Sequence, residues 1–152
     1  MKIVITAFED TDLEYVKQNV DYLVSIGGPK MPEPKSYDSS DPNHLRLVFY
    51  DAENQKEDDH PSKTDIKKLI SWAKSKNHKK TWQFHCKAGK HRSTAAAAIV
   101  YFIFYGDENK TMAKIKQVRE EADPNRLMLS LADKILGSKL EDAAKKAFKR
   151  TK

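Results

Sequence analysis

The chain has 152 residues, of which 39% are hydrophobic and 33% charged, a composition typical of one folded globular domain. No apolar run reaches the roughly 18 residues of a membrane-spanning helix, so no such span is expected. The first residues, MKIVITA, lack the apolar region and cleavage site of a secretory signal, which favours a cytoplasmic location.

The formal net charge of +6 is unevenly distributed along the chain. Residues 1–60 contain 6 Lys and Arg against 13 Asp and Glu, whereas residues 61–152 contain 22 against 9. The second part is therefore expected to face an anion. Nucleic acid is not the expected partner, because only 5 of the 28 cationic residues are Arg and no nucleic-acid-binding signature appears.

Hydrophobic periodicity predicts alternating strands and helices, followed by helices alone. In chain order we predict a strand at 2–7, a helix at 12–19 capped by Thr11 or Asp12, strands at 22–26 and 45–50, a helix at 62–76, a strand at 81–86 and a buried helix at 95–105. Three further helical faces are predicted at 112–118, 127–135 and 140–147. This order favours an α/β fold, with a central, mostly parallel sheet of about four to five strands flanked by helices.

Two connections in this pattern are candidates for function. Residues 27–43 contain four of the six prolines and form a long surface loop of the kind that borders active sites. Residues 85–94, HCKAGKHRST, join a predicted strand to the predicted buried helix. Ligands bind at the carboxyl ends of parallel strands, and a helix N-terminus directs backbone N–H groups toward an anion.

The chemistry of the second connection depends on Cys86 and Arg92. Cys86 is the only cysteine, which excludes an internal disulfide and a multi-cysteine zinc site, and a helix N-terminus stabilises a thiolate. The five intervening residues allow the loop to curl around a tetrahedral oxyanion that Arg92 contacts in a bidentate manner. Gly89 at the apex can adopt a positive φ, so that successive amides point inward.

HCKAGKHRST resembles the signature His-Cys-five residues-Arg-Ser/Thr of the cysteine-dependent protein tyrosine phosphatases, in particular the compact dual-specificity type. The similarity extends over residues 44–137 and includes HLRLVFYD and PNRLMLSLADKILG, as in small bacterial and phage members. The resemblance implies a phosphotyrosine protein phosphatase-like fold and a single catalytic domain over residues 1–152. It also implies hydrolysis of phosphomonoesters with no metal and no cofactor.

The resemblance assigns a role to each matching residue. Cys86 becomes the nucleophile that forms a thiophosphate intermediate, Arg92 binds the phosphate, Ser93 assists departure of the sulfur and His85 supports the loop. The residues expected to bind the substrate phosphate are Lys87, Ala88, Gly89, Lys90, His91 and Arg92. His91 either contacts the substrate or only shapes the loop, and each lysine either contacts it or points to solvent.

A general acid must protonate the leaving group and later activate water. The family carries this Asp in the loop that follows the strand before the amphipathic helix, and Asp51 stands there. Asp58 and Asp59 are the alternatives. The other interpretations are that Asp51 is a turn residue ending the strand and that Asp58 and Asp59 compensate the helix N-terminus.

Two substrate classes are compatible with this pattern. The first is protein phosphotyrosine, with phosphoserine and phosphothreonine in the dual-specificity case. The second is an inositol phosphate or phosphoinositide, because HCKAGK resembles the phosphoinositide phosphatases and GKHR the fungal and plant inositol-pyrophosphate phosphatases. A non-catalytic phosphoprotein-binding module is the alternative of another class. The protein is expected to be a monomer.

Overall fold

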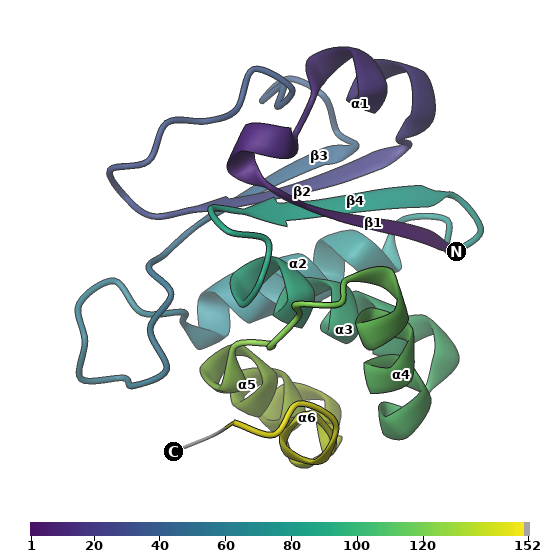
Figure 1. Cartoon of the computed structure of the whole chain (residues 1–152). Helices are drawn as coiled ribbons and strands as arrows, with labels where there is room; N and C mark the ends of the chain where they lie inside the picture. The colour runs from purple at the N-terminus through teal and green to yellow at the C-terminus, as the bar shows by residue number, and fades with distance from the viewer. Residues whose placement is uncertain (151–152) are drawn as a thin grey trace.

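The computed structural model describes residues 1–150, which form a four-stranded sheet with helices on both faces (Figure 1). The strands are β1 (Lys2–Ala7), β2 (Tyr22–Gly27), β3 (His44–Val48) and β4 (Thr81–Cys86). Their order is β1-β4-β2-β3, and every neighbouring pair is parallel. The predicted α/β class and its parallel sheet of four to five strands are confirmed.

Helix α1 lies on one side of the sheet and α2 to α6 on the other (Figure 1). The helices are α1 (Leu13–Asn19), α2 (Lys63–Lys74), α3 (Arg92–Tyr105), α4 (Glu108–Val118), α5 (Arg126–Leu136) and α6 (Leu140–Ala147). A 3₁₀ turn, η1 (Phe8–Asp10), was not predicted from the sequence. None of the helices in residues 1–150 combines the length and the apolar character that crossing a membrane requires.

Local side-chain contacts explain where the helices begin. Asp12, not Thr11, is the N-cap of α1, because its carboxylate accepts the N–H of Tyr15. Helix α2 begins with a capping box in which Ser62 and Asp65 exchange side-chain and backbone hydrogen bonds. In both helices a polar residue in the sequence therefore marks the position of the N-terminus.

Strand β3 ends earlier than the apolar alternation predicts. Phe49 still donates its N–H to the carbonyl of Gly27 in β2, but the N–H of Tyr50 turns away to the carbonyl of Asp59. The chain therefore leaves the sheet at Tyr50, and Asp51 enters a loop near the carboxyl edge.

The central strand and the buried helix bring the cysteine loop to this edge. Strand β4 lies between β1 and β2, and α3 packs against β4, β1 and β2 on one side and against α2, α4 and α5 on the others. Helix α3 is apolar all round because it has these neighbours on nearly every side. Cys86 ends β4 and Arg92 begins α3, so the loop between them opens at the carboxyl edge of the sheet.

Candidate active site

The loop at residues 87–91 has all five carbonyl groups turned outward and hydrogen-bonded. Each has a donor from another segment: Phe8 N–H to Lys87 (3.1 Å), Arg119 Nη2 to Ala88 (3.2 Å), Arg119 Nε to Gly89 (3.0 Å), Asp123 N–H to Lys90 (2.9 Å) and Asn125 N–H to His91 (2.9 Å). Thr94 Oγ1 and Ala95 N–H in α3 donate further hydrogen bonds to the last two carbonyls. Within residues 1–150, the backbone N–H groups of residues 87–91 have no protein acceptor. The loop therefore presents unpaired donors on its inner side, which is the arrangement that binds an anion.

Gly89 has the backbone conformation that the sequence predicts. Its φ is +67°, and a Cβ there would lie 2.7 Å from the carbonyl carbon of Thr6 in β1. Both the positive φ and the close approach of β1 require glycine at this position.

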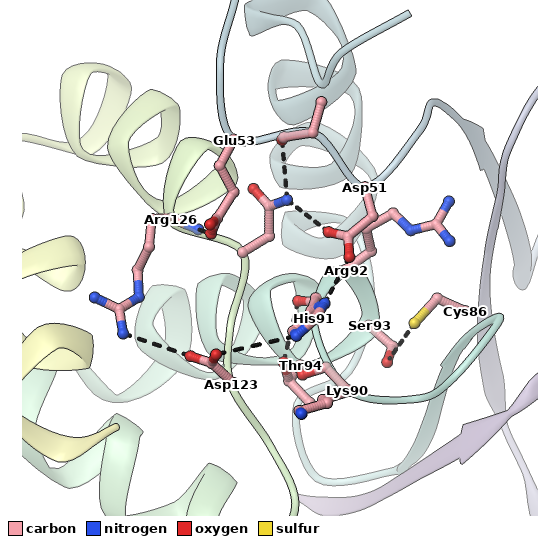
Figure 2. Close-up of polar contacts among 12 residues, drawn as sticks. Asp51, Glu53, Cys86, Lys90, His91, Arg92, Ser93, Thr94, Asp123 and Arg126 are labelled. Carbon is pink, nitrogen blue, oxygen red and sulfur yellow. Dashed lines mark hydrogen bonds and ion pairs between the residues drawn. The ribbon is translucent and has the colours of Figure 1, made fainter. Parts of the chain in front are cut away.

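Cys86 and Ser93 lie next to one another at the base of the loop (Figure 2). Cys86 is 2% exposed, and its Sγ lies 3.2 Å from the Oγ of Ser93. Ser93, in the first turn of α3, is fully buried. The contact places a hydroxyl where it can donate a hydrogen bond to the sulfur.

Arg92 carries its charge into a cavity of about 350 Å³ without a carboxylate partner among the described residues. Its Nη1 donates to the carbonyl of Phe49 at 2.8 Å, and its buried Nε has no protein partner. The cavity is also lined by Gly28, Lys30, Met31, Tyr50 and Lys87. Three cationic side chains thus surround one hollow beside the loop.

His85 is buried beneath the loop as a neutral side chain. Its Nε2 lies 2.6 Å from the Oγ of Ser25, and that hydroxyl accepts a hydrogen bond from Arg46 Nη1 at 2.7 Å. Burial, together with the weaker repulsion from Arg46 and Arg92, lowers the pKa of His85 to about 4. His85 lies in β4 directly before Cys86, and its role as a supporting residue stays a prediction.

Asp51 is held by two residues from distant segments (Figure 2). Its Oδ2 lies 2.6 Å from His91 Nδ1, and its Oδ1 accepts a hydrogen bond from Asn125 Nδ2 at 2.8 Å. The same Asn125 Nδ2 donates to the carbonyl of Ala52 at 3.0 Å. The segment that carries Asp51 is therefore fixed against both the cysteine loop and the start of α5.

These contacts shift the pKa values of Asp51 and His91 in opposite directions. Burial raises the pKa of Asp51, but the hydrogen bonds from His91 and Asn125 and the charges of His91 and Arg92 outweigh burial, so the pKa falls below its usual value. The hydrogen bond to Asp51 raises the pKa of His91, with burial opposing it. Each side chain thus favours the charged form of the other, and the two pKa values move apart.

The two lysines of the loop face different regions. Lys87 lines the cavity beside Arg92, whereas Lys90 points away from Cys86 (Figure 2) and lines a separate groove of about 840 Å³. Asp58 and Asp59 are exposed, and within residues 1–150 neither side chain has a hydrogen bond or ion pair with the loop, whereas Asp51 does. Among the three candidate acids, only Asp51 contacts the cysteine loop.

Sequence reasoning missed several residues that build the site. Arg119, which binds two loop carbonyls, follows α4 without any motif that marks it. Asn125 lies in the segment PNRLMLSLAD, which carried the family resemblance, but nothing in that segment indicated a contact with Asp51. Within residues 1–150 no group of three or more His, Cys, Asp or Glu side chains is placed to hold a metal ion.

An inner strand of this parallel sheet ends in a cysteine, and a five-residue loop joins that cysteine to an arginine at the start of a buried helix. This arrangement is the protein tyrosine phosphatase fold. The likeness extends to dual-specificity phosphatases. Human DUSP28 superimposes with a TM-score of 0.64 at 17% identity, over 87% of this chain and 86% of that one. DUSP15 gives 0.63 at 19% identity, over 99% and 92% of the two chains.

A third similar structure is PTPMT1 in complex with PI(5)P, with a TM-score of 0.57 at 14% identity over 96% of this chain and 92% of that one. No protein-family model and no curated protein sequence matches the chain. These solved structures thus confirm the predicted phosphotyrosine protein phosphatase-like fold.

Proposed function

We propose that the protein is a metal-independent phosphomonoester hydrolase, of the protein tyrosine or dual-specificity type, in which residues 1–152 form one catalytic domain. The observation that carries this proposal is the loop at residues 87–91. Among residues 1–150, its carbonyls all accept hydrogen bonds from residues outside the loop while its N–H groups have no acceptor, and Cys86 and Arg92 stand at its two ends. Such a loop stabilises the charge of a phosphoryl group in transfer without a metal.

In the first step the Cys86 thiolate attacks phosphorus. A sulfur–phosphorus bond forms, the bond from phosphorus to the ester oxygen breaks, and the leaving group departs as an alcohol or phenol once it has received a proton. Arg92 and the loop N–H groups bind the equatorial oxygens. The hydrogen bond between Arg92 and Phe49 uses only Nη1, which leaves the other guanidinium N–H groups for the substrate.

The proton comes from the pair of Asp51 and His91. A bound phosphate dianion disfavours the carboxylate of Asp51 and raises its pKa, so that Asp51 takes the proton from His91 Nδ1 and passes it to the leaving oxygen. The 2.6 Å contact between the two side chains supports this transfer. Asp51 is therefore the general acid of the proposal, with His91 as its proton source.

In the second step water attacks the thiophosphate. Asp51 accepts a proton from that water, the sulfur–phosphorus bond breaks, and Cys86 leaves as a thiolate with inorganic phosphate as the product. Ser93 donates a hydrogen bond to the departing sulfur, as its 3.2 Å contact with Sγ supports.

For the substrate we favour a phosphorylated protein side chain. Tyr50 and Met31 line the cavity beside Arg92 and offer apolar surface to an aromatic ring. An inositol phosphate or phosphoinositide is the second candidate, because Lys30 and Lys87 line the same cavity and fit further phosphate groups. The structure of PTPMT1 with PI(5)P, which this chain resembles in fold, also favours that candidate.

Phosphate release from an aryl phosphate in the presence of a chelator tests the proposal. The wild-type protein should release phosphate, whereas Cys86→Ser should abolish turnover and still bind a phosphate ester. Retained activity of Cys86→Ser would end the proposal, and binding without turnover by the wild type would favour the phosphoprotein-binding module. Phosphotyrosine peptides, phosphoserine peptides and inositol phosphates, compared by kcat/KM, decide the substrate class.

A further inference from the structure

Arg150, near the C-terminal end, bridges two segments that surround Asp51. Its Nη1 and Nη2 donate to Glu53 Oε1 and Oε2 at 2.6 and 2.9 Å, and its Nε donates to Asp123 Oδ2 at 2.9 Å. One planar guanidinium therefore binds a carboxylate in a bidentate manner and a second carboxylate at the same time. The partners lie 97 and 27 residues away in the sequence.

The chain that carries Arg150 is itself anchored. Phe148, directly after α6, is 7% exposed and belongs to the hydrophobic core. Its carbonyl accepts a hydrogen bond from Arg126 Nη2 at 2.8 Å. The packing of Phe148 therefore fixes the backbone two residues before Arg150. The ion pairs of Arg150 do not have to offset the entropy of ordering that part of the chain.

Both carboxylates that Arg150 binds lie next to the contacts of Asp51. Glu53 follows Asp51 by two residues, and its Oε2 also accepts the backbone N–H of Arg126 at 2.6 Å. Asp123 Oδ2 lies 4.0 Å from Nε2 of His91 (Figure 2). These links form a closed ring. Arg150 binds Glu53, the chain joins Glu53 to Asp51, Asp51 contacts His91, His91 lies near Asp123, and Asp123 binds Arg150.

We propose that Arg150 is a positioning residue that holds the segment of Asp51, Ala52 and Glu53 closed over the cysteine loop. The role of Asp51 in this inference rests on the proposed phosphatase function. Without Arg150 the segment keeps the hydrogen bonds from Asn125 and Arg126 but loses the bridge that fixes Glu53 from its outer side. Asp51 then spends less time at the position from which it protonates a leaving group.

The charges of this ring support a real contribution from Arg150. Its side chain is 40% exposed, and Glu53 and Asp123 are 35% and 20% exposed, so an isolated pair here would be weak. A bidentate contact within a network of two arginines and two carboxylates is the exception to that rule. Burial raises the pKa of Glu53, but the hydrogen bonds from Arg150 and Arg126 outweigh it and lower the pKa overall.

The test compares Arg150→Ala with Lys149→Ala, which removes the same charge from the neighbouring exposed residue, whose side chain makes no ion pair within residues 1–150. With phenyl phosphate, which has a poor leaving group, Arg150→Ala should lower kcat/KM about tenfold, because kcat/KM reports only the steps through cleavage of the ester bond. With 2,4-dinitrophenyl phosphate, whose leaving group departs without a proton, kcat/KM should change less than about twofold. The Kd of inorganic phosphate should be unchanged, and Lys149→Ala should match the wild type throughout.

Hydrogen–deuterium exchange provides a measurement that does not depend on activity. Amides of the segment at residues 50–57, such as Ala52 N–H, which binds the carbonyl of Tyr50, should exchange faster in Arg150→Ala and not in Lys149→Ala. Unchanged exchange would overturn the inference, as would an equal loss of kcat/KM with both leaving groups. If the wild type releases no phosphate but exchange still rises, the proposed function fails while the structural bridge stands.

Discussion

Replacing Gly89 by Ala tests whether the shape of the cysteine loop depends on a single missing side chain. The added Cβ would lie 2.7 Å from the carbonyl carbon of Thr6, 2.8 Å from its oxygen and 2.8 Å from Arg119 Nη2. Two of these atoms belong to the backbone of β1 and cannot rotate away. The loop must therefore move by several tenths of an ångström to reach the 3.4 Å of an ordinary contact.

The expected magnitude has two parts. A non-glycine residue in the left-handed region costs about 1–2 kcal/mol, and forcing an atom into a packed site costs about 1–3 kcal/mol more. Gly106→Ala and Gly137→Ala are matched controls, because these glycines have φ of +71° and +67° but nothing within 4 Å of an added Cβ. Their free energy of unfolding should fall only by the cost of the left-handed conformation, about 1–2 kcal/mol.

Chemical denaturation and steady-state kinetics together measure the two effects. Gly89→Ala should lower the free energy of unfolding by about 2–5 kcal/mol and, because a misplacement approaching 1 Å is costly in an active site, lower kcat/KM for an aryl phosphate about 100-fold. The two controls should keep kcat/KM within about twofold of the wild type. If Gly89→Ala behaves like Gly106→Ala in both assays, the close approach of β1 does not determine the loop.

Three further predictions concern the partners of the loop. Arg119→Ala removes the hydrogen bonds to two loop carbonyls, and steady-state kinetics should show kcat/KM for an aryl phosphate lowered about tenfold or more. Asn125→Ala leaves α5 without its N-cap and removes one of the two hydrogen-bond partners of Asp51, so the free energy of unfolding should fall by about 2 kcal/mol, and denaturation should detect it. His91→Gln bears on pH: the pair keeps its proton below the raised pKa of His91, so kcat for phenyl phosphate should fall as pH rises through that pKa. In His91→Gln only Asp51 can hold the proton, so kcat should begin to fall at a lower pH than in the wild type.

Much of the fold could be predicted because its signals are local. The strand at residues 81–86 and the apolar helix after it follow from periodicity, and the positive φ of Gly89 follows from the loop that joins them. The end of β3 could not be predicted from local periodicity. The alternation of apolar residues continues to Phe49, but the turn of Tyr50 toward Asp59 depends on a hydrogen bond between loop positions that carry no pattern.

The surroundings of the candidate site could be predicted only in part. The resemblance to the phosphatases, which place the general acid in the loop after this strand, implies Asp51, and its role stays a prediction. Its contact with His91 crosses 40 residues, and that of Arg150 with Glu53 crosses 97. Such contacts arise from how helices pack on a sheet, and no periodic pattern in the sequence indicates them.

The five bound carbonyls of the cysteine loop also determine how an anion would bind. Their donors come from η1, from the first turn of α3, from the end of α4 and from the turn before α5, so the loop is ordered by the packing of the whole chain rather than by its ligand. The conformational entropy of the loop is lost when the protein folds, and little of it remains to be lost on binding. Association with a phosphate ester should then resemble the docking of two rigid bodies, with a small change in backbone dynamics and an affinity limited mainly by the removal of water from the anion.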